Sequence, residues 1–333
     1  MTKPLISVKD LTVRFKTDEG LVTAVEGVTF DIAPGEVLGL VGESGSGKSV
    51  TAKALMLLNP DNAVYDPEGS ITLNIGEEQI DVLSLAPKER MVIRGGAVSM
   101  IFQEPMASFA PAISIGEQMV EQLLIHSDMN KASAKELSIE MLARVGIPDP
   151  AQRFGQYAFE FSGGMRQRAM IAMALSTKPK LLIADEPTTA LDVTIQAQVI
   201  DLMKNLVSEF HMAILFITHD LGVIAQTVDR VAVMYLGKLI EKGTVRQILR
   251  KPGHPYTQGL LHALPRLDDL DTPLTAIKGD IPSPLDRPTG CVFHTRCPVS
   301  LGAECQSRIP VYTNTEDGHQ VACLLVEKEG APA

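Results

Sequence analysis

Several features are missing from this sequence of 333 residues, and each absence narrows the class of protein. No stretch approaches the roughly 18 to 20 consecutive apolar residues that a membrane-spanning helix needs, so we do not expect the chain to cross a membrane. The first residues lack the apolar core of a signal peptide, which predicts a cytosolic protein. The formal net charge is -10, so we do not expect a nucleic acid as partner.

Cysteine is scarce, and the few that occur gather near the end of the chain. The four cysteines are Cys291, Cys297, Cys305 and Cys323. In a cytosolic protein such a group favours metal binding or redox chemistry over structural disulfides. Zinc sites usually contain CxxC pairs, and none occurs here, but a wider spacing can still hold a metal between four thiolates.

Short apolar runs alternate with helical patterns before residue 250. The clearest buried strands are predicted at residues 37–41, 180–184 and 213–218. This alternation is typical of an α/β domain with a mostly parallel sheet. Apolar residues at helical spacing in residues 115–125 and 131–145 predict a helical insertion between the sheet's elements.

Prolines crowd the region after residue 250, for example in residues 252–255 and 282–288. Such spacing disfavours long helices and central strands. We therefore predict one domain over residues 1–250 and a small irregular C-terminal extension over residues 251–333.

A glycine-rich segment lies between the first of these strands and a predicted helix over residues 48–58. It consists of Gly42, Glu43, Ser44, Gly45, Ser46, Gly47, Lys48 and Ser49. Strand, loop and helix in this order are the context of a phosphate-binding P-loop. The glycines let main-chain N–H groups turn toward phosphates, Lys48 supplies a cation to the β and γ phosphates, and Ser49 can bind Mg²⁺.

Two acids, Asp185 and Glu186, end an apolar strand. A carboxylate at the C-terminal edge of a strand is well placed to hold Mg²⁺, and the next carboxylate can polarise a water beyond the γ-phosphate. We assign Asp185 to magnesium and Glu186 to the general base.

A second glycine-rich segment, residues 161–168, begins a predicted helix far from the first. It could contact a γ-phosphate, yet one nucleotide seldom needs two cradles. The pair of segments therefore predicts a protein that closes as a dimer around ATP.

Together these segments resemble the ATP-binding cassette family, the nucleotide-binding subunits of ABC transporters. The matching motifs, in chain order, are residues 42–49 (Walker A), Gln103 (Q-loop), residues 162–167 (signature), residues 181–186 (Walker B), Asp192 (D-loop) and His219 (switch histidine). The resemblance implies an α/β P-loop NTPase with a RecA-like core, an antiparallel β subdomain and a helical subdomain at about residues 104–165.

The resemblance also implies roles for single residues. Gln103 would join Ser49 and Asp185 at the magnesium, and Gln103 and His219 would act beside Glu186 in catalysis. Val50 lies in the ATP-binding segment, at a position where the family commonly has threonine.

Two of the assignments keep an alternative. Phe15 matches the position of an aromatic ring that stacks on adenine, but the alternation of its segment also fits an ordinary strand residue. His219 can hydrogen-bond a γ-phosphate, and it can equally be a satisfied histidine at a strand end.

The family mechanism places two cassettes head to tail, with the signature of one facing the ATP of the other. The signature residues so assigned are Ser162, Gly163, Gly164 and Gln167. Glu186 then activates water, and hydrolysis loosens the dimer.

The extension resembles that of the peptide-transporter branch in residues 254–261, 281–284 and 290–298. This implies an ATPase at the cytoplasmic face of the membrane that energises import of dipeptides or oligopeptides. Implied partners are a second, different ATPase subunit, two membrane permeases reached through residues 103–109, and an extracytoplasmic substrate-binding protein. Nickel, opines, antimicrobial peptides and sugars remain alternative cargoes.

Some members of that branch carry a 4Fe-4S cluster on matching cysteines. An iron–sulfur cluster, zinc or another metal, and unligated thiols all remain open for the four cysteines. Two other classes compete with the transporter: a soluble ABC ATPase of DNA repair or translation, and a metalloprotein without transport function. A soluble ABC ATPase usually has a long coiled-coil insertion or two cassettes in one chain, and this sequence has neither. The complete set of nucleotide-binding motifs argues against a metalloprotein without transport function.

Overall fold

The computed structural model describes the chain except residues 1–2, 105–107, 189–192, 264–276, 317 and 331–333. It divides into two compact units, and neither unit is one continuous stretch of sequence. Unit 1 comprises Met1–Leu5, Ile32–Glu36 and Leu73–Ile217, and unit 2 comprises Ile6–Asp31, Val37–Thr72 and Thr218–Ala333.

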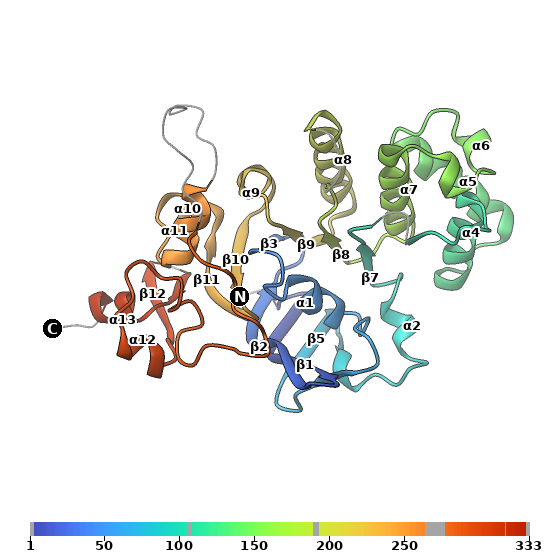
Figure 1. Ribbon diagram of the computed structural model, residues 1–333. Coiled ribbons are helices and arrows are strands. Elements are labelled where there is room, and N and C mark those ends of the chain that lie inside the picture. Colours follow the sequence, from blue (N-terminus) through green and yellow to red (C-terminus); the bar gives the residue numbers. More distant parts are fainter. Residues whose placement is uncertain (1–2, 105–107, 189–192, 264–276, 317, 331–333) are drawn as a thin grey trace. The chain divides into compact units, whose positions relative to one another are not determined.

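The sheet of unit 1 is built from three parallel strands. They are β7 (Val98–Ile101), β8 (Leu181–Asp185) and β9 (Ala213–Thr218) (Figure 1). Every residue of the three is buried, which is why they read as continuous apolar runs in the sequence. The prediction of strands near residues 180–184 and 213–218 is confirmed.

Helices α4 (Ile115–His126), α5 (Lys131–Arg144) and α7 (Gly163–Ser176) of unit 1 pack against one another. Each begins at a residue whose side-chain oxygen accepts a main-chain N–H: Ser114, Asn130 and Ser162. The predicted helical insertion is therefore confirmed. The other elements of unit 1 are β6 (Glu78–Asp81), η1 (Val82–Ser84), α2 (Arg90–Ile93), α6 (Pro150–Arg153), η2 (Ala158–Glu160) and α8 (Val193–Phe210).

The main sheet of unit 2 joins the predicted first domain to the extension. Its strands lie in the order β12 (Tyr312–Glu316), β13 (His319–Ala322), β11 (Lys238–Thr244), β10 (Arg230–Tyr235) and β3 (Val37–Val41). Strands β3 and β10 are parallel, and the other neighbours are antiparallel. The proline pattern did not predict this added hairpin, whose two strands contain no proline.

The antiparallel β subdomain begins with β1 (Ile6–Thr17) and β2 (Gly20–Ile32), which a two-residue turn joins into a hairpin. Strand β4 (Ala63–Tyr65) pairs with β1 antiparallel, and β5 (Ser70–Ile75) follows. The short helices of unit 2 are α1 (Lys48–Ala54), α9 (Leu221–Thr227), α10 (Val245–Arg250), α11 (Pro255–His262), α12 (Ala303–Ser307) and α13 (Leu324–Gly330).

Helix α1 is shorter than the helix predicted over residues 48–58. Leu57 adopts a left-handed φ of 53°, and the N–H groups of Met56 and Leu58 both turn back to the Lys53 carbonyl. Pro60 then disfavours a helical conformation at residue 59. The prediction followed the apolar pattern and missed this termination.

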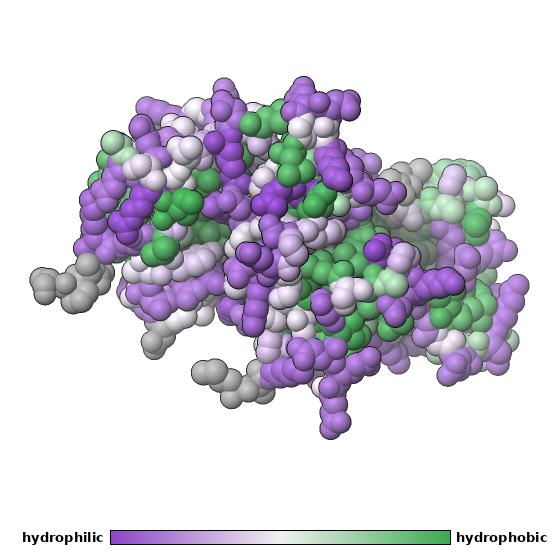
Figure 2. Space-filling view, turned by 90° about the horizontal axis from the view of Figure 1, so that it is seen from below, coloured by the Kyte–Doolittle hydropathy of each residue, from purple (hydrophilic) through white to green (hydrophobic). Residues whose placement is uncertain are grey.

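On the face drawn in Figure 2, hydrophilic residues cover most of the surface and smaller hydrophobic areas lie between them. Within the described parts of the chain, no helix combines the length and the apolar character that crossing a membrane would require.

Candidate functional site

The phosphate loop, residues 42–49, has a backbone that only glycine fits at two positions. Gly42 has a φ of 155°, and a Cβ there would collide with the Met234 carbonyl and lie 2.7 Å from Ser46 Oγ. Gly47 has a φ of 98°, and a Cβ there would lie 2.8 Å from the Ala24 carbonyl oxygen. The loop therefore packs closely against other parts of unit 2, and its conformation depends on glycine at these two positions.

Lys48 lies inside this loop with 5% of its surface exposed. Its Nζ donates hydrogen bonds to the carbonyl oxygens of Gly42, at 2.7 Å, and Glu43, at 2.9 Å. Ser46 Oγ, itself buried, lies 3.4 Å from the same ammonium. The positive charge of Lys48 is thus held by the main chain of the loop that the sequence predicts to bind phosphates.

The acids of unit 1 end a buried strand as predicted. Asp185 is the last residue of β8 and is 3% exposed. Glu186 follows with a left-handed φ of 48°, and its N–H donates to the Ile217 carbonyl at 2.9 Å. Gln103 Nε2 donates to Glu186 Oε2 at 3.1 Å. Non-glycine residues seldom adopt such a φ.

The signature segment, residues 161–168, opens helix α7 at the surface of unit 1. Ser162 is exposed and accepts the Met165 N–H at 3.3 Å, and a Cβ at Gly163 would meet no atom within 4 Å. Gly164 is partly exposed, whereas Gln167 is 2% exposed. The role predicted for Gln167 at a partner's ATP stays a prediction, and its burial does not favour it.

Three further predicted residues belong to unit 2. Phe15 is half-buried in β1, and its main chain pairs with that of Ala63 in β4. Val50 is partly exposed in α1. His219 is exposed directly after β9, where Asp220 caps α9 by accepting the N–H groups of Gly222 and Val223. Asp192, the predicted D-loop residue, lies outside the described residues.

The four cysteines all lie in unit 2 and carry no disulfide. Burial above all, with a smaller contribution from the three other thiols, raises the pKa of Cys291 to about 11. The main chains of Cys291 and Cys305 are joined by a hydrogen bond of 2.8 Å.

The arrangement of these thiols does not support the predicted metal. Among the residues that the structure describes, no group of three or more His, Cys, Asp or Glu side chains could hold a metal ion. The iron–sulfur and zinc hypotheses are therefore not supported, and no step of the activity is assigned to this cluster.

The sequence did not reveal that the extension contacts the phosphate loop. Arg296 forms an ion pair with Glu43 at 2.7 Å, and the Tyr256 hydroxyl accepts the Glu43 N–H at 2.8 Å. Both extension residues stood in runs that resemble the peptide-transporter branch. Their separation of more than two hundred residues from Glu43 gave no local signal for the contact.

Two family comparisons cover different parts of the chain. Residues 25–189 match the family described as ABC transporter. Residues 240–305 match the family described as the C-terminal region of oligopeptide/dipeptide transporters.

Similar proteins match over nearly the whole chain. The oligopeptide transport ATP-binding protein AppD of Bacillus subtilis is 47% identical, with 98% of each chain covered. The dipeptide transport ATP-binding protein DppD of the same organism is 47% identical, covering 99% of this chain and 97% of the relative. The oligopeptide transport ATP-binding protein OppD of Salmonella typhimurium is 51% identical, covering 98% and 95%.

Solved cassettes share the fold of the larger part of the chain. The dimeric, post-hydrolysis structure of the ATP-binding cassette MJ0796, bound to ADP and Pi, has a TM-score of 0.64 and 25% identity. It covers 72% of this chain and 99% of the cassette. A second dimeric structure of MJ0796 gives a TM-score of 0.63 and 26% identity, with the same coverage.

Proposed function

This chain belongs to the ATP-binding proteins of ABC transporters, and we propose that it binds and hydrolyses ATP to energise the import of peptides. The observation that carries the proposal is the similarity to three peptide-transport ATP-binding proteins, which are 47%, 47% and 51% identical over nearly the full chain. The match of the extension to the oligopeptide/dipeptide transporter region supports peptides over the alternative cargoes, nickel, opines, antimicrobial peptides and sugars.

The phosphate loop is the proposed ATP site. The closely packed Gly42 and Gly47 fit a cradle of main-chain N–H groups around phosphates, and the buried Lys48 supplies the positive charge. Gly45, Ser46 and Ser49 belong to the same cradle, and Val50 and Phe15 are proposed to contact the nucleotide.

The magnesium ion is proposed to be held by Ser49, Gln103 and Asp185. A hydroxyl, an amide oxygen and a carboxylate are oxygen ligands of the kind that Mg²⁺ prefers, and Asp185 is a buried carboxylate at a strand end. When bound, the ion neutralises negative charge on the phosphates.

Glu186 is the proposed general base, and its carboxylate is oriented by Gln103. Its backbone is left-handed, with a φ of 48°, directly after the buried strand β8. A carboxylate so held can accept a proton from an attacking water. His219 is proposed to donate a hydrogen bond to the γ-phosphate.

The signature segment is proposed to serve the ATP of a second cassette. The exposed Ser162 and the open space around Gly163 leave room for a partner's phosphate. We propose that this second cassette is a different ATPase subunit. The assembly would further contain two permeases and a substrate-binding protein, and this chain would lie peripherally at the cytoplasmic face of the membrane.

Replacing Glu186 with glutamine tests the catalytic proposal. The variant keeps the size of the side chain but loses the base, so it should bind ATP normally while turnover falls by at least about a hundredfold. The matched control is Glu209→Gln, which changes an exposed carboxylate paired with Arg144. Turnover at the wild-type rate in Glu186→Gln would contradict the assigned role.

Co-purification from membranes tests the assembly. Two multi-span permeases and a second ATP-binding subunit should accompany the affinity-tagged chain. Recovery of ribosomes or DNA in their place would overturn the transport proposal.

A further inference from the structure

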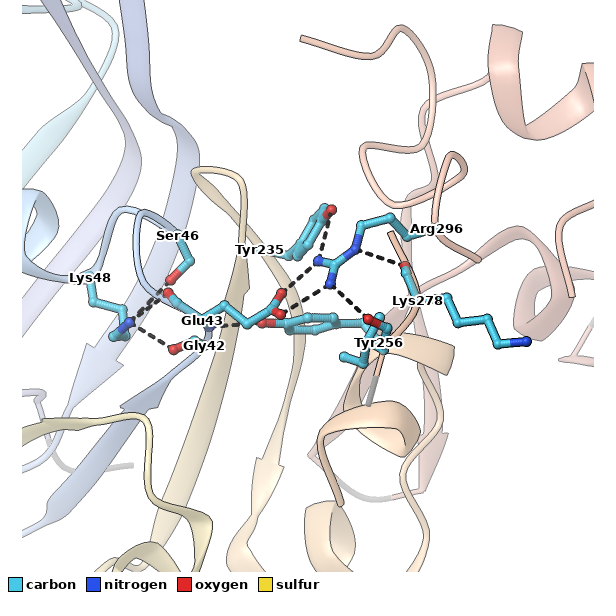
Figure 3. Close-up of polar contacts among 9 residues, drawn as sticks. Gly42, Glu43, Ser46, Lys48, Tyr235, Tyr256, Lys278 and Arg296 are labelled. Carbon is cyan, nitrogen blue, oxygen red and sulfur yellow. Dashed lines mark hydrogen bonds and ion pairs between the residues drawn. The ribbon is translucent and has the colours of Figure 1, made fainter. Parts of the chain in front are cut away.

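Two side chains of the extension hold one residue of the phosphate loop. The Arg296 guanidinium makes a two-pronged contact with the Glu43 carboxylate, at 2.7 Å to Oε2 and 3.1 Å to Oε1. The Tyr256 hydroxyl accepts the Glu43 main-chain N–H at 2.8 Å. Figure 3 shows Glu43 between these two residues on one side and the loop's Lys48 on the other. The extension therefore contacts both the side chain and the backbone of Glu43.

The Arg296 side chain is shielded from water, which strengthens its ion pair with the partly buried Glu43. The side chain of Arg296 is 5% exposed and that of Glu43 is 26% exposed. The hydrogen bond to Glu43 raises the pKa of Arg296, so the guanidinium stays charged. Burial raises the pKa of Tyr256, so its hydroxyl stays protonated. Two-pronged arginine–carboxylate pairs fix geometry as well as supplying energy.

The two extension residues are themselves held rigidly. The rings of Tyr235, Tyr256 and Phe293 pack against one another, with centroid separations of 4.7 to 5.4 Å. Arg296 lies over the Tyr235 ring, and its Nε donates to the Lys278 carbonyl at 3.3 Å. This platform leaves the guanidinium and the phenol little freedom to move away from Glu43.

The contact continues through Glu43 to Lys48. The Glu43 carbonyl accepts from Lys48 Nζ at 2.9 Å, one residue away from the Gly42 carbonyl that does the same. The main chain at Glu43 therefore carries the Tyr256 contact on its N–H and the Lys48 contact on its carbonyl. A shift of the main chain at Glu43 would therefore move a carbonyl oxygen that accepts a hydrogen bond from Lys48.

We propose that Arg296 and Tyr256 are positioning residues for ATP binding, which hold the phosphate loop at Glu43 in the conformation that receives the nucleotide. This inference rests on the proposed function of the loop. Holding a binding loop in place lowers the ordering cost of binding, so nucleotide affinity depends on the extension. A purely structural role would anchor the extension and leave affinity unchanged.

The test measures the dissociation constant of ATP in the presence of magnesium, by calorimetry on the full chain, together with thermal unfolding. Arg296→Ala should weaken ATP binding about tenfold, and Tyr256→Phe about threefold, because each removes one hold on Glu43. Arg296→Lys keeps the charge and should recover part of the affinity. If Arg296→Ala does not fold, Arg296→Lys and Tyr256→Phe decide the question.

Matched controls come from the extension itself. Arg308→Ala removes an arginine that pairs with Glu304 and Glu327, and Tyr312→Phe removes a hydroxyl that donates to the Leu239 carbonyl. These contacts do not involve the loop, so both controls should keep wild-type ATP affinity even where they lower the unfolding temperature.

A double-mutant cycle completes the experiment. Glu43→Gln combined with Arg296→Ala should weaken binding little more than Arg296→Ala alone, because both changes remove the same contact. Additive losses, or ATP affinity within twofold of wild type in Arg296→Ala and Tyr256→Phe, would overturn the inference. Lys48→Ala tests the proposed ATP site separately from the role of Arg296. Unchanged ATP binding in that variant would refute the ATP site itself, whatever the Arg296 variants show.

Discussion

An added methyl group at Gly42 or Gly47 of the phosphate loop would collide with main-chain atoms, whereas at Gly163 of the signature segment it would meet open space. Lys48 is buried within the first segment, and Ser162 is exposed at the start of the second. The two glycine-rich segments read alike in the sequence, but only the phosphate loop is shaped by close packing in its own unit.

This difference separates two uses of glycine. In the phosphate loop, glycine allows a backbone path that the surrounding unit enforces. In the signature segment, the small residues leave open space at the surface of unit 1, where another molecule can approach the main chain. The contrast agrees with the proposal that one segment holds an ATP molecule and the other meets the ATP of a partner cassette.

The largest effect should come from Gly42→Ala. The added Cβ meets the rigid Met234 carbonyl, so we expect a loss of at least about 3 kcal/mol in the free energy of unfolding, together with loss of ATP binding. Urea denaturation and calorimetry measure the two. A variant as stable as wild type would show that the loop is not held as tightly as its packing indicates.

Lowering the pH should reduce the free energy of unfolding of unit 2, which contains the phosphate loop. Burial lowers the pKa of His254 to about 4, while the unfolded chain titrates near 6.5, so the unfolded state binds the proton first as the pH falls. The stabilisation is complete above pH 6.5 and is lost as the pH falls toward 4, by about 2 kcal/mol at pH 5. Urea denaturation at pH 7.5 and pH 5 measures the loss.

His254→Asn is the control for this pH dependence. His254 Nδ1 accepts the Tyr256 N–H at the start of α11, and asparagine keeps a side-chain acceptor there without titrating in this range. The variant should lose less stability than wild type over the same pH interval. An equal loss in both proteins would assign the pH dependence to other groups.

A smaller effect is expected at the start of the signature helix. Ser162→Ala removes the acceptor of the Met165 N–H and should cost about 1 kcal/mol of unfolding free energy. Ser162→Thr keeps a hydroxyl and serves as the control. Chemical denaturation distinguishes this capping loss from an effect on turnover, which should be measured in the assembled transporter.

The smallest effect on stability is expected for Gly163→Ala. The site is open and lies in the first turn of α7, so the unfolding free energy should change by less than about 1 kcal/mol. Turnover of the assembled transporter should nevertheless fall, because the methyl group fills space proposed for a partner's phosphate. Destabilisation as large as that of Gly42→Ala would erase the contrast between the two segments.

Much of the local structure could be predicted from the sequence. Strand β9 and the start of α4 coincide with the predicted positions, because fully buried strands and amphipathic helices leave clear apolar patterns. The end of α1 could not be predicted from that pattern, since the apolar residues continue past the left-handed turn at Leu57.

The candidate site was predictable to a similar extent. The phosphate loop and the two acids at the end of β8 could be recognised, because their residue types form motifs at short spacing. The contact from Gln103 to Glu186 and the two holds on Glu43 join residues far apart in the chain. No local pattern reports such contacts, because they exist only after the chain has folded.

The sequence by itself determined the class of the protein, since the ordered motifs specify phosphate chemistry through local residue order. Tertiary structure alone decided that the extension adds a hairpin to the main sheet of unit 2 and that Arg296 and Tyr256 reach the phosphate loop. The physical reason is that main-chain pairing and buried ion pairs depend on which distant surfaces the folded core brings together.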